Sequence, residues 1–223
     1  MLYSNNKLQS IDIQTRWFLP LYIIMLSISM IYSKSIEDEL WSGIELKKKI
    51  TSKIKLELGQ QIRMKDHWSK FHKTFTNISL SYEGISIIEL SGGYRYLIYE
   101  DKEKYRLNFD SKIEINTKYS PSFRIRLEQE SDLDKNPEEL VVRNKLSFSD
   151  PISKRSIPYV SYEIFHSLDN GIFSYNQFRI GFGFKYEFIK NQSIKLFYTY
   201  EKNLEKKEIV NTNICGLKYG YSF

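Results

Sequence analysis

The sequence predicts an all-β fold, an up-and-down antiparallel transmembrane β-barrel of about 10–12 strands. Three observations predict this class. Long stretches of the chain alternate between apolar and polar residues, which is the period of a β-strand. The 223-residue chain has no alanine, the best helix former, and 15% of its residues are aromatic. Short turn-like sequences such as Asp169-Asn170-Gly171 separate the alternating stretches.

The composition excludes several other classes of protein. Cys215 is the only cysteine, so neither a disulfide framework nor a cysteine-rich zinc site is expected. Only residues 17–31 form a long uncharged apolar run, which excludes a bundle of membrane-spanning helices. The net charge of +6 is spread along the chain without a basic patch, so we expect no nucleic-acid partner. We also expect no cofactor and no metal.

Residues 1–35 have the pattern of a secretory signal peptide. Lys7 and Arg16 precede the apolar run 17–31, and the small polar residues Ser33 and Ser35 follow it. The run is shorter than the roughly 20 residues of a spanning helix, although a retained signal anchor is an alternative. We therefore expect export, cleavage near Ser33–Ser35, and a single barrel domain over residues 36–223.

Alternation is clearest in four segments, 104–115, 123–130, 177–188 and 193–201. In 177–188 the even positions run from Phe178 to Phe188 and are all apolar or aromatic, whereas the odd positions include Arg179, Lys185 and Glu187. A helix would mix these two sets, while a strand places each set on its own face. Phe197 is an exception to the alternation in 193–201.

Weaker alternation predicts seven further strands, at 42–49, 53–63, 74–83, 86–99, 140–149, 158–167 and 208–223. Most of the eleven candidates are longer than the usual 5–6 residues of a strand and suit a tilted membrane crossing of about 9–11 residues. Single-chain bacterial barrels usually have an even number of strands, so we expect that this count is wrong by one.

Alternation alone does not identify the face that meets water. The apolar face is too bulky for the interior of a small soluble barrel, and the polar face mixes both signs of charge with small residues. We therefore expect the apolar face to meet lipid and the charges to pair inside the lumen. The expected lumen charges are Arg95, Arg124, Arg126, Glu128, Glu130, Arg143, Glu163, Arg179, Glu187 and Glu201.

The last strand carries a second cue. Leu217, Tyr219, Tyr221 and Phe223 alternate, and the sequence ends on an aromatic residue. Such an ending resembles the signal that the outer-membrane assembly machinery reads. We expect that machinery and the outer-membrane lipid as partners; the sequence indicates no oligomeric state.

The chain resembles an uncharacterised family of small Gram-negative outer-membrane β-barrel proteins over about residues 40–223. The resemblance implies the fold and an outer-membrane location, and it brings no catalytic residues. It is carried by LWSGIELKKKITSKIKLELGQQIR (40–63), SGGYRYLIY (91–99), FRIRLEQE (123–130), VVRNKLSFS (141–149), PYVSYEIFHSLDNGIFSYNQFRIGFGFKYEF (158–188), KLFYTYEKN (195–203) and GLKYGYSF (216–223).

Candidate chemistry is sparse. His166 and Ser167 are typical of hydrolases by residue type, but adjacent strand residues point to opposite faces, so they cannot form a dyad by themselves. His67 and His72, near Asp66, would make a weak metal site. Glu128 and Glu130 share a face as paired carboxylates would. Arg124 and Arg126 lie on the same face, which favours a structural ion-pair network.

We therefore expect a non-enzymatic outer-membrane barrel with a structural role in the envelope or a narrow, porin-like passage. One alternative is an outer-membrane hydrolase that acts on lipid or surface substrates. Another is a soluble, secreted, lipocalin-like barrel with an apolar ligand inside.

Overall fold

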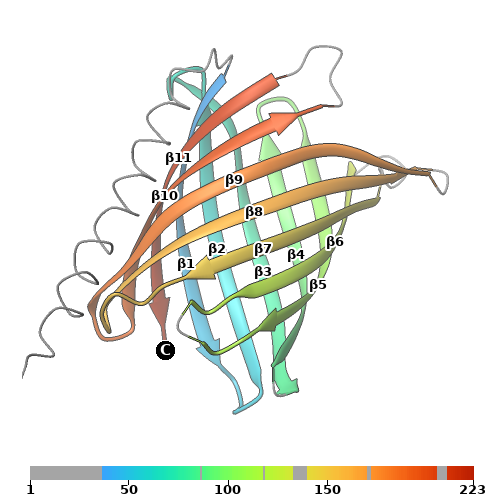
Figure 1. Cartoon of the computed structure of the whole chain (residues 1–223). Coiled ribbons are helices and arrows are strands. Elements are labelled where there is room, and N and C mark those ends of the chain that lie inside the picture. Colours follow the sequence, from blue (N-terminus) through green and yellow to red (C-terminus); the bar gives the residue numbers. More distant parts are fainter. Residues whose placement is uncertain (1–36, 86, 118, 133–139, 170–171, 205–209) are drawn as a thin grey trace, which may run out of the picture. The chain divides into compact units, whose positions relative to one another are not determined.

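Eleven strands close into one barrel in the computed structural model (Figure 1). The structure describes residues 37–223 except 86, 118, 133–139, 170–171 and 205–209, so the expected signal peptide lies outside the described residues. The strands are β1 (Glu37–Lys49), β2 (Ile54–Lys65), β3 (Lys70–Ile85), β4 (Ile88–Tyr99), β5 (Glu103–Glu114), β6 (Ser122–Asp132), β7 (Leu140–Ser149), β8 (Ser156–Asp169), β9 (Ile172–Ile189), β10 (Gln192–Asn203) and β11 (Val210–Ser222).

The barrel closes through a parallel pair, whereas each strand pairs antiparallel with its neighbours in sequence. The expected even number of strands is therefore wrong for the described residues, because β1 joins β11 directly from Glu37↔Thr212 to Lys47↔Ser222. Two parallel strands both begin at one end of the barrel and both finish at the other. β1 thus begins at one end of the barrel and the chain terminus after β11 lies at the other (Figure 1).

Strand β9 begins at Ile172, earlier than the alternation at 177–188 predicts. A bulge explains the difference, because His166 pairs with Tyr175 while Phe165 pairs with Gln177, which leaves Asn176 unpaired. The extra residue reverses the phase of alternation. Phe173 and Tyr175 consequently join the exposed apolar face, although they are odd-numbered residues.

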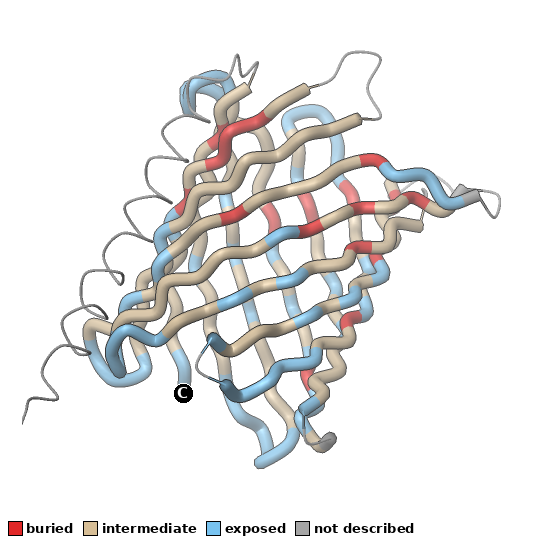
Figure 2. Tube along the Cα trace, viewed as in Figure 1, coloured by how far each residue is buried: buried red, intermediate tan, exposed pale blue. Residues whose placement is uncertain are grey.

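The outer face of the barrel is apolar and the inner face is polar. The exposed large side chains include Leu107, Phe109 and Leu196, whereas the buried residues include Asp110, Glu128 and Glu163. Figure 2 shows that few residues are buried and that most of each strand is half-buried or exposed, as in a single-walled sheet. This distribution is the reverse of a soluble barrel, so the alternative with an apolar ligand chamber is wrong.

Phe197, the exception in its strand, points inward for a structural reason. Its ring lies where a Cβ on Gly216 of β11 would be, and Gly216 pairs directly with it. The ring of Tyr159 covers Gly183 in the same way between β8 and β9. An inward aromatic over a glycine fills the wall of the barrel without a second side chain.

The part of the chain that the structure describes contains no helix long and apolar enough to cross a membrane.

Candidate functional site: the charged interior

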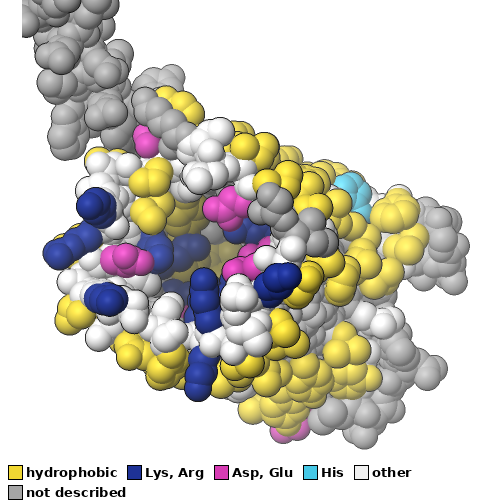
Figure 3. All heavy atoms as spheres, turned by 90° about the horizontal axis from the view of Figure 1, so that it is seen from below, with side chains coloured by type: hydrophobic (Ala, Val, Ile, Leu, Met, Phe, Trp, Pro, Cys, Tyr) yellow, Lys and Arg dark blue, Asp and Glu magenta, His cyan; other side chains and the backbone are white. Residues whose placement is uncertain are grey.

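The inside of the barrel holds a cavity of about 510 Å³. Figure 3 shows this interior from below, with basic and acidic side chains around and within the opening and hydrophobic side chains on the outside. The cavity is lined by the carboxylates Glu39, Glu128, Glu163 and Glu201. The cations that line it are Arg63, Lys73, Arg95, Arg106, Arg124, Arg126, Arg143, Lys145, Arg179, Lys195 and Lys218.

The structure places most of the expected lumen charges around this cavity. Those that line it are Arg95, Arg124, Arg126, Glu128, Arg143, Glu163, Arg179 and Glu201. Glu130 is not among the lining residues, but it contacts the lining residue Arg106. Glu187 pairs with Lys185 at 3.2 Å and its side chain is 42% exposed. It lies close to the turn after β9 and outside the cavity lining.

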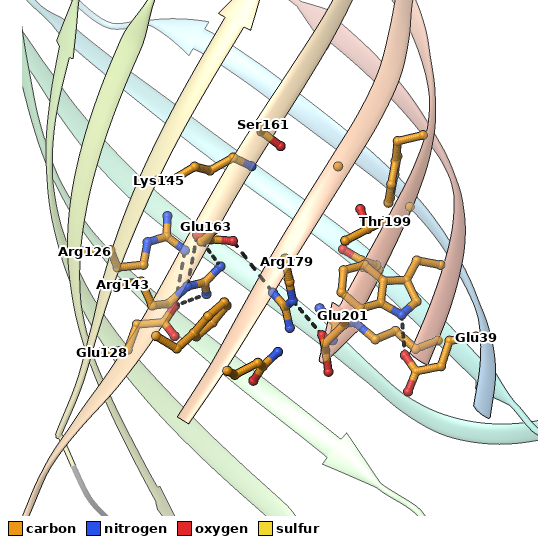
Figure 4. A pocket seen from close by; sticks show the side chains of 18 of the residues that line it. Glu39, Arg126, Glu128, Arg143, Lys145, Ser161, Glu163, Arg179, Thr199 and Glu201 are labelled. Atoms are coloured by element: carbon orange, nitrogen blue, oxygen red, sulfur yellow. Dashed lines mark hydrogen bonds and ion pairs between the residues drawn. The ribbon is translucent and has the colours of Figure 1, made fainter. Parts of the chain in front are cut away.

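One part of the wall is a continuous ion-pair network (Figure 4). Arg143 of β7 donates to Glu128 of β6 at 2.8 Å and to Glu163 of β8 at 2.9 Å. Glu163 also accepts from Arg124 at 2.8 Å, and Arg179 of β9 pairs with Glu201 of β10 at 2.6 Å. The network arises because inward residues on neighbouring strands lie directly opposite one another, as in Glu163↔Arg179.

The paired carboxylates on β6 belong to the same network. Glu128 contacts Arg106, Arg126 and Arg143, and Glu130 contacts Arg106. Glu128 is thus surrounded by three guanidinium groups, whereas Glu130 pairs with the Arg106 guanidinium and the Lys104 ammonium group. The ion-pair interpretation of Glu128 and Glu130 agrees with this geometry.

The wall formed by β2, β3 and β4 differs from this network. Arg63 stacks on Trp41 with its Cζ 3.5 Å from the ring centroid, and Arg95 stacks on Phe75 at 4.2 Å. Neither guanidinium has a carboxylate within ion-pair distance among the described residues. Lys73 donates to the Tyr99 hydroxyl at 3.2 Å. Aromatic rings therefore take the place of carboxylates around Arg63 and Arg95, whereas Lys55 of β2 pairs with Glu83 of β3 and Glu89 of β4 elsewhere on the same wall. The expected self-pairing of the lumen does not extend to these two arginines.

Sequence reasoning missed Arg63 and Lys73 because their segments alternate only weakly, and Lys73 precedes the expected strand 74–83. The structure begins β3 earlier, at Lys70. Cross-strand register is the signal that could have found them, since Trp41 pairs with Arg63 and Arg63 pairs with Lys73.

His67 and His72 bind different carboxylates. The Nδ1 of His67 lies 2.8 Å from Asp38, and the Nδ1 of His72 lies 2.8 Å from Glu39. Asp38 and Glu39 are adjacent on β1 and therefore point to opposite faces of the wall. The described residues hold no group of three or more His, Cys, Asp or Glu side chains suited to a metal ion.

His166 and Ser167 point to opposite faces of β8. The His166 ring packs on the outside near Phe173 and Tyr175, with centroids 6.5 Å and 5.8 Å away. Ser167 is fully buried and contacts Ser174 and Asn176. His166 therefore lies on the opposite side of the wall from this serine.

The residues of the expected C-terminal assembly signal lie on the outer face of the barrel. Leu217 is 46% exposed, the Tyr219 hydroxyl donates to Gln192 at 3.0 Å, and the Tyr221 ring packs edge-on against Phe223. Phe223 follows the end of β11 and is 65% exposed. The alternating aromatic edge therefore faces away from the charged interior.

The fold and this charged interior define a closed, mostly antiparallel barrel of the outer-membrane type. The chain belongs to the family described as "Protein of unknown function (DUF2490)", whose model matches residues 38–211. A search of curated proteins gives no match.

Solved structures resemble this barrel at low sequence identity. The translocator domain of the autotransporter NalP from Neisseria meningitidis is 14% identical, with a TM-score of 0.52 over 78% of this chain and 77% of that chain. This likeness supports the barrel fold. The KdgM porin in complex with disordered oligogalacturonate is 11% identical, with a TM-score of 0.49 over 84% and 99% of the two chains. The beta domain of the Bordetella autotransporter BrkA is 12% identical, with a TM-score of 0.47 over 78% and 86%.

Proposed function

We propose that this protein is a non-enzymatic barrel of the Gram-negative outer membrane and that its charged lumen is a narrow passage for small solutes. The observation that carries the proposal is the open-ended cavity of about 510 Å³ inside a wall whose outer face is apolar. Water and ions are the natural contents of such an interior, and lipid is the natural surrounding of such an exterior.

The strand lengths support a membrane crossing. The shortest strand, β7, has 10 residues, and β9 has 18. A tilted strand needs about 9–11 residues to cross the hydrocarbon layer, so every described strand is long enough. The apolar side chains on the outer face continue around the barrel, as in Leu58, Phe109 and Leu196 of three different strands. Outer-membrane lipid is therefore the first partner that we propose.

The passage is narrow because side chains occupy much of the interior. Phe165 is 7% exposed, and the guanidinium carbons of Arg143 and Arg179 each lie 4.6 Å from its ring centroid. Such a cavity holds a solute of the size of a small metabolite and excludes larger ones. We also propose that the outward aromatic edge of β11 is read by the outer-membrane assembly machinery.

The test combines fractionation, a gel and a bilayer. The full chain is expressed with its leader, outer membranes are isolated, and the protein is run with and without boiling in detergent. We expect it in the outer membrane with a mobility that changes on boiling, and small conductance steps in a planar bilayer. A protein that stays in solution without detergent would contradict the membrane location. A folded barrel without conductance would contradict the passage.

A matched pair of variants tests the lumen itself. Phe165→Ala removes a ring from the cavity, so we expect larger conductance steps. Phe173→Ala removes an outward ring that is 62% exposed and should leave the steps unchanged. Equal steps in the two variants would contradict a passage through this cavity.

A further inference from the structure

We infer that the wall formed by β2, β3 and β4 is a binding site for a small oxyanion, meaning a carboxylate, sulfate or phosphate group. Arg63 of β2, Lys73 of β3 and Arg95 of β4 all line the cavity. Arg63 pairs with Lys73, while Phe75, two residues farther along β3, contacts both guanidiniums. Three cations on adjacent strands thus face one volume.

Aromatic rings hold the two guanidiniums in place. The Cζ atom of Arg63 lies 3.5 Å from the Trp41 ring centroid and 5.2 Å from the Phe75 ring centroid. The Cζ atom of Arg95 lies 4.2 Å from the centroid of the same Phe75 ring. Stacking uses the flat face of a guanidinium and leaves its edge, which carries five N–H donors, available to an acceptor. The Nε atoms of Arg63 and Arg95 are buried and have no hydrogen-bond partner among the described residues.

The neighbouring carboxylates are already engaged. Glu39 accepts from Trp41 Nε1 and lies 2.8 Å from His72, while Glu128 and Glu130 contact the arginines of the network. The protein therefore supplies carboxylates to Arg106, Arg124, Arg126, Arg143 and Arg179, but supplies none within ion-pair distance to Arg63 or Arg95 among the described residues.

A buried donor without a partner lowers stability, so an external acceptor is expected where the protein provides none. Two preoriented guanidinium edges and an ammonium group suit an oxyanion, because two oxygens of a carboxylate or a phosphate accept parallel bonds from arginine. The inference rests on the proposed function in one respect, that solutes reach the lumen. Binding and conduction are therefore measured separately.

Binding is measured by tryptophan fluorescence on the full chain in detergent. Trp17→Phe and Trp68→Phe leave Trp41, which contacts Arg63, as the only tryptophan. Inorganic phosphate is titrated at constant ionic strength with chloride as the balancing anion. We expect a saturable change in Trp41 fluorescence. A change that is linear, or equal for chloride, would overturn the site.

Variants then locate the site. Arg95→Gln removes a guanidinium that does not contact Trp41, and we expect the phosphate midpoint to rise at least tenfold. Arg155→Gln makes the same change at an exposed residue of the β7–β8 loop and should leave the midpoint unchanged. Equal midpoints in the two variants would overturn the site. A change in gel mobility on boiling verifies that each variant is folded, and the titration of the parent chain tests the inference even where a variant is not.

Conductance separates this inference from the proposed passage. In a potassium chloride gradient across a planar bilayer, we expect a zero-current potential whose sign indicates selectivity for chloride over potassium. This potential should shift toward zero in Arg95→Gln. Phosphate binding without conductance would support the oxyanion site and contradict the passage. Conductance without phosphate binding would overturn the oxyanion site and leave the passage intact.

Discussion

The Nη2 atom of Arg143 lies 2.9 Å from the Oε1 atom of Glu163, with both side chains buried inside the barrel. Glu163 also accepts from Arg124 at 2.8 Å and lies 3.9 Å from Arg179. One carboxylate therefore joins guanidiniums from three strands, β6, β7 and β9. Removing it would leave several cations close together with less compensation.

Glu163→Gln should destabilise the barrel strongly. The amide keeps the shape of the side chain but removes the charge, and breaking a buried pair by removing one partner costs about 3–5 kcal/mol. The free energy of unfolding by urea in lipid vesicles measures this cost. The matched control is Glu187→Gln, where the side chain is 42% exposed and the pair is worth about 1 kcal/mol or less. A similar loss in the two variants would contradict a structural role for Glu163.

Gly216→Ala should destabilise the barrel through Phe197. The new Cβ would overlap the Phe197 ring, which must move, at a cost of about 1–3 kcal/mol. Gly92→Ala is the control, because a Cβ at Gly92 meets nothing within 4 Å. The double variant Gly216→Ala with Phe197→Leu should recover part of the loss. The unfolding midpoints of the unaltered protein and of the three variants test this prediction. A double variant no more stable than Gly216→Ala would contradict the contact between Gly216 and Phe197.

Phe109→Arg should reveal whether the outer face meets lipid. Phe109 is 52% exposed in the middle of β5, where an arginine facing lipid costs about 2–4 kcal/mol. Ile115 is 51% exposed but follows the end of β5, where the same change costs about 0–1 kcal/mol. Unfolding from vesicles measures both. Equal and small effects would instead indicate that water surrounds the barrel.

Glu37→Cys and Ser222→Cys should be labelled from opposite sides of the membrane. The two residues lie near opposite ends of the barrel because β1 and β11 are parallel. In a Cys215→Ser background, a membrane-impermeant maleimide applied to intact cells should label one variant, and lysis should expose the other. Labelling of both variants in intact cells would mean that the two ends share a side, as in a barrel of even strand number.

Much of the barrel could be predicted from sequence because successive residues of a strand face alternately the apolar outside and the polar inside of the barrel. In the segment 104–115, where Phe109 faces out and Asp110 faces in, only Ser111 interrupts the alternation, and the predicted bounds differ from those of β5 by a single residue at each end. At Asn176 the bulge reverses the phase, and the beginning of β9 could not be predicted by extending the pattern.

The site was harder to predict than the fold. Charge pairing such as Glu163 with Arg179 follows from the faces of neighbouring strands once their register is known, but alternation does not give register. Arg63 and Lys73 were missed and Arg95 was predicted only as a lumen charge, since the partners of Arg63 and Arg95 are the rings of Trp41 and Phe75. No local sequence pattern distinguishes an arginine that meets a carboxylate from one that stacks on a ring.

The parallel contact between β1 and β11 also limits how this chain can be rearranged. In a barrel of even strand number, a short turn could join the last strand to the first and allow circular permutation. Here such a linker would have to span the barrel, because a 13-residue strand such as β11 covers about 40 Å. The simplest linker that could do so is a twelfth strand between β11 and β1, antiparallel to both. Circular permutation of this protein therefore requires a linker that spans the length of the barrel.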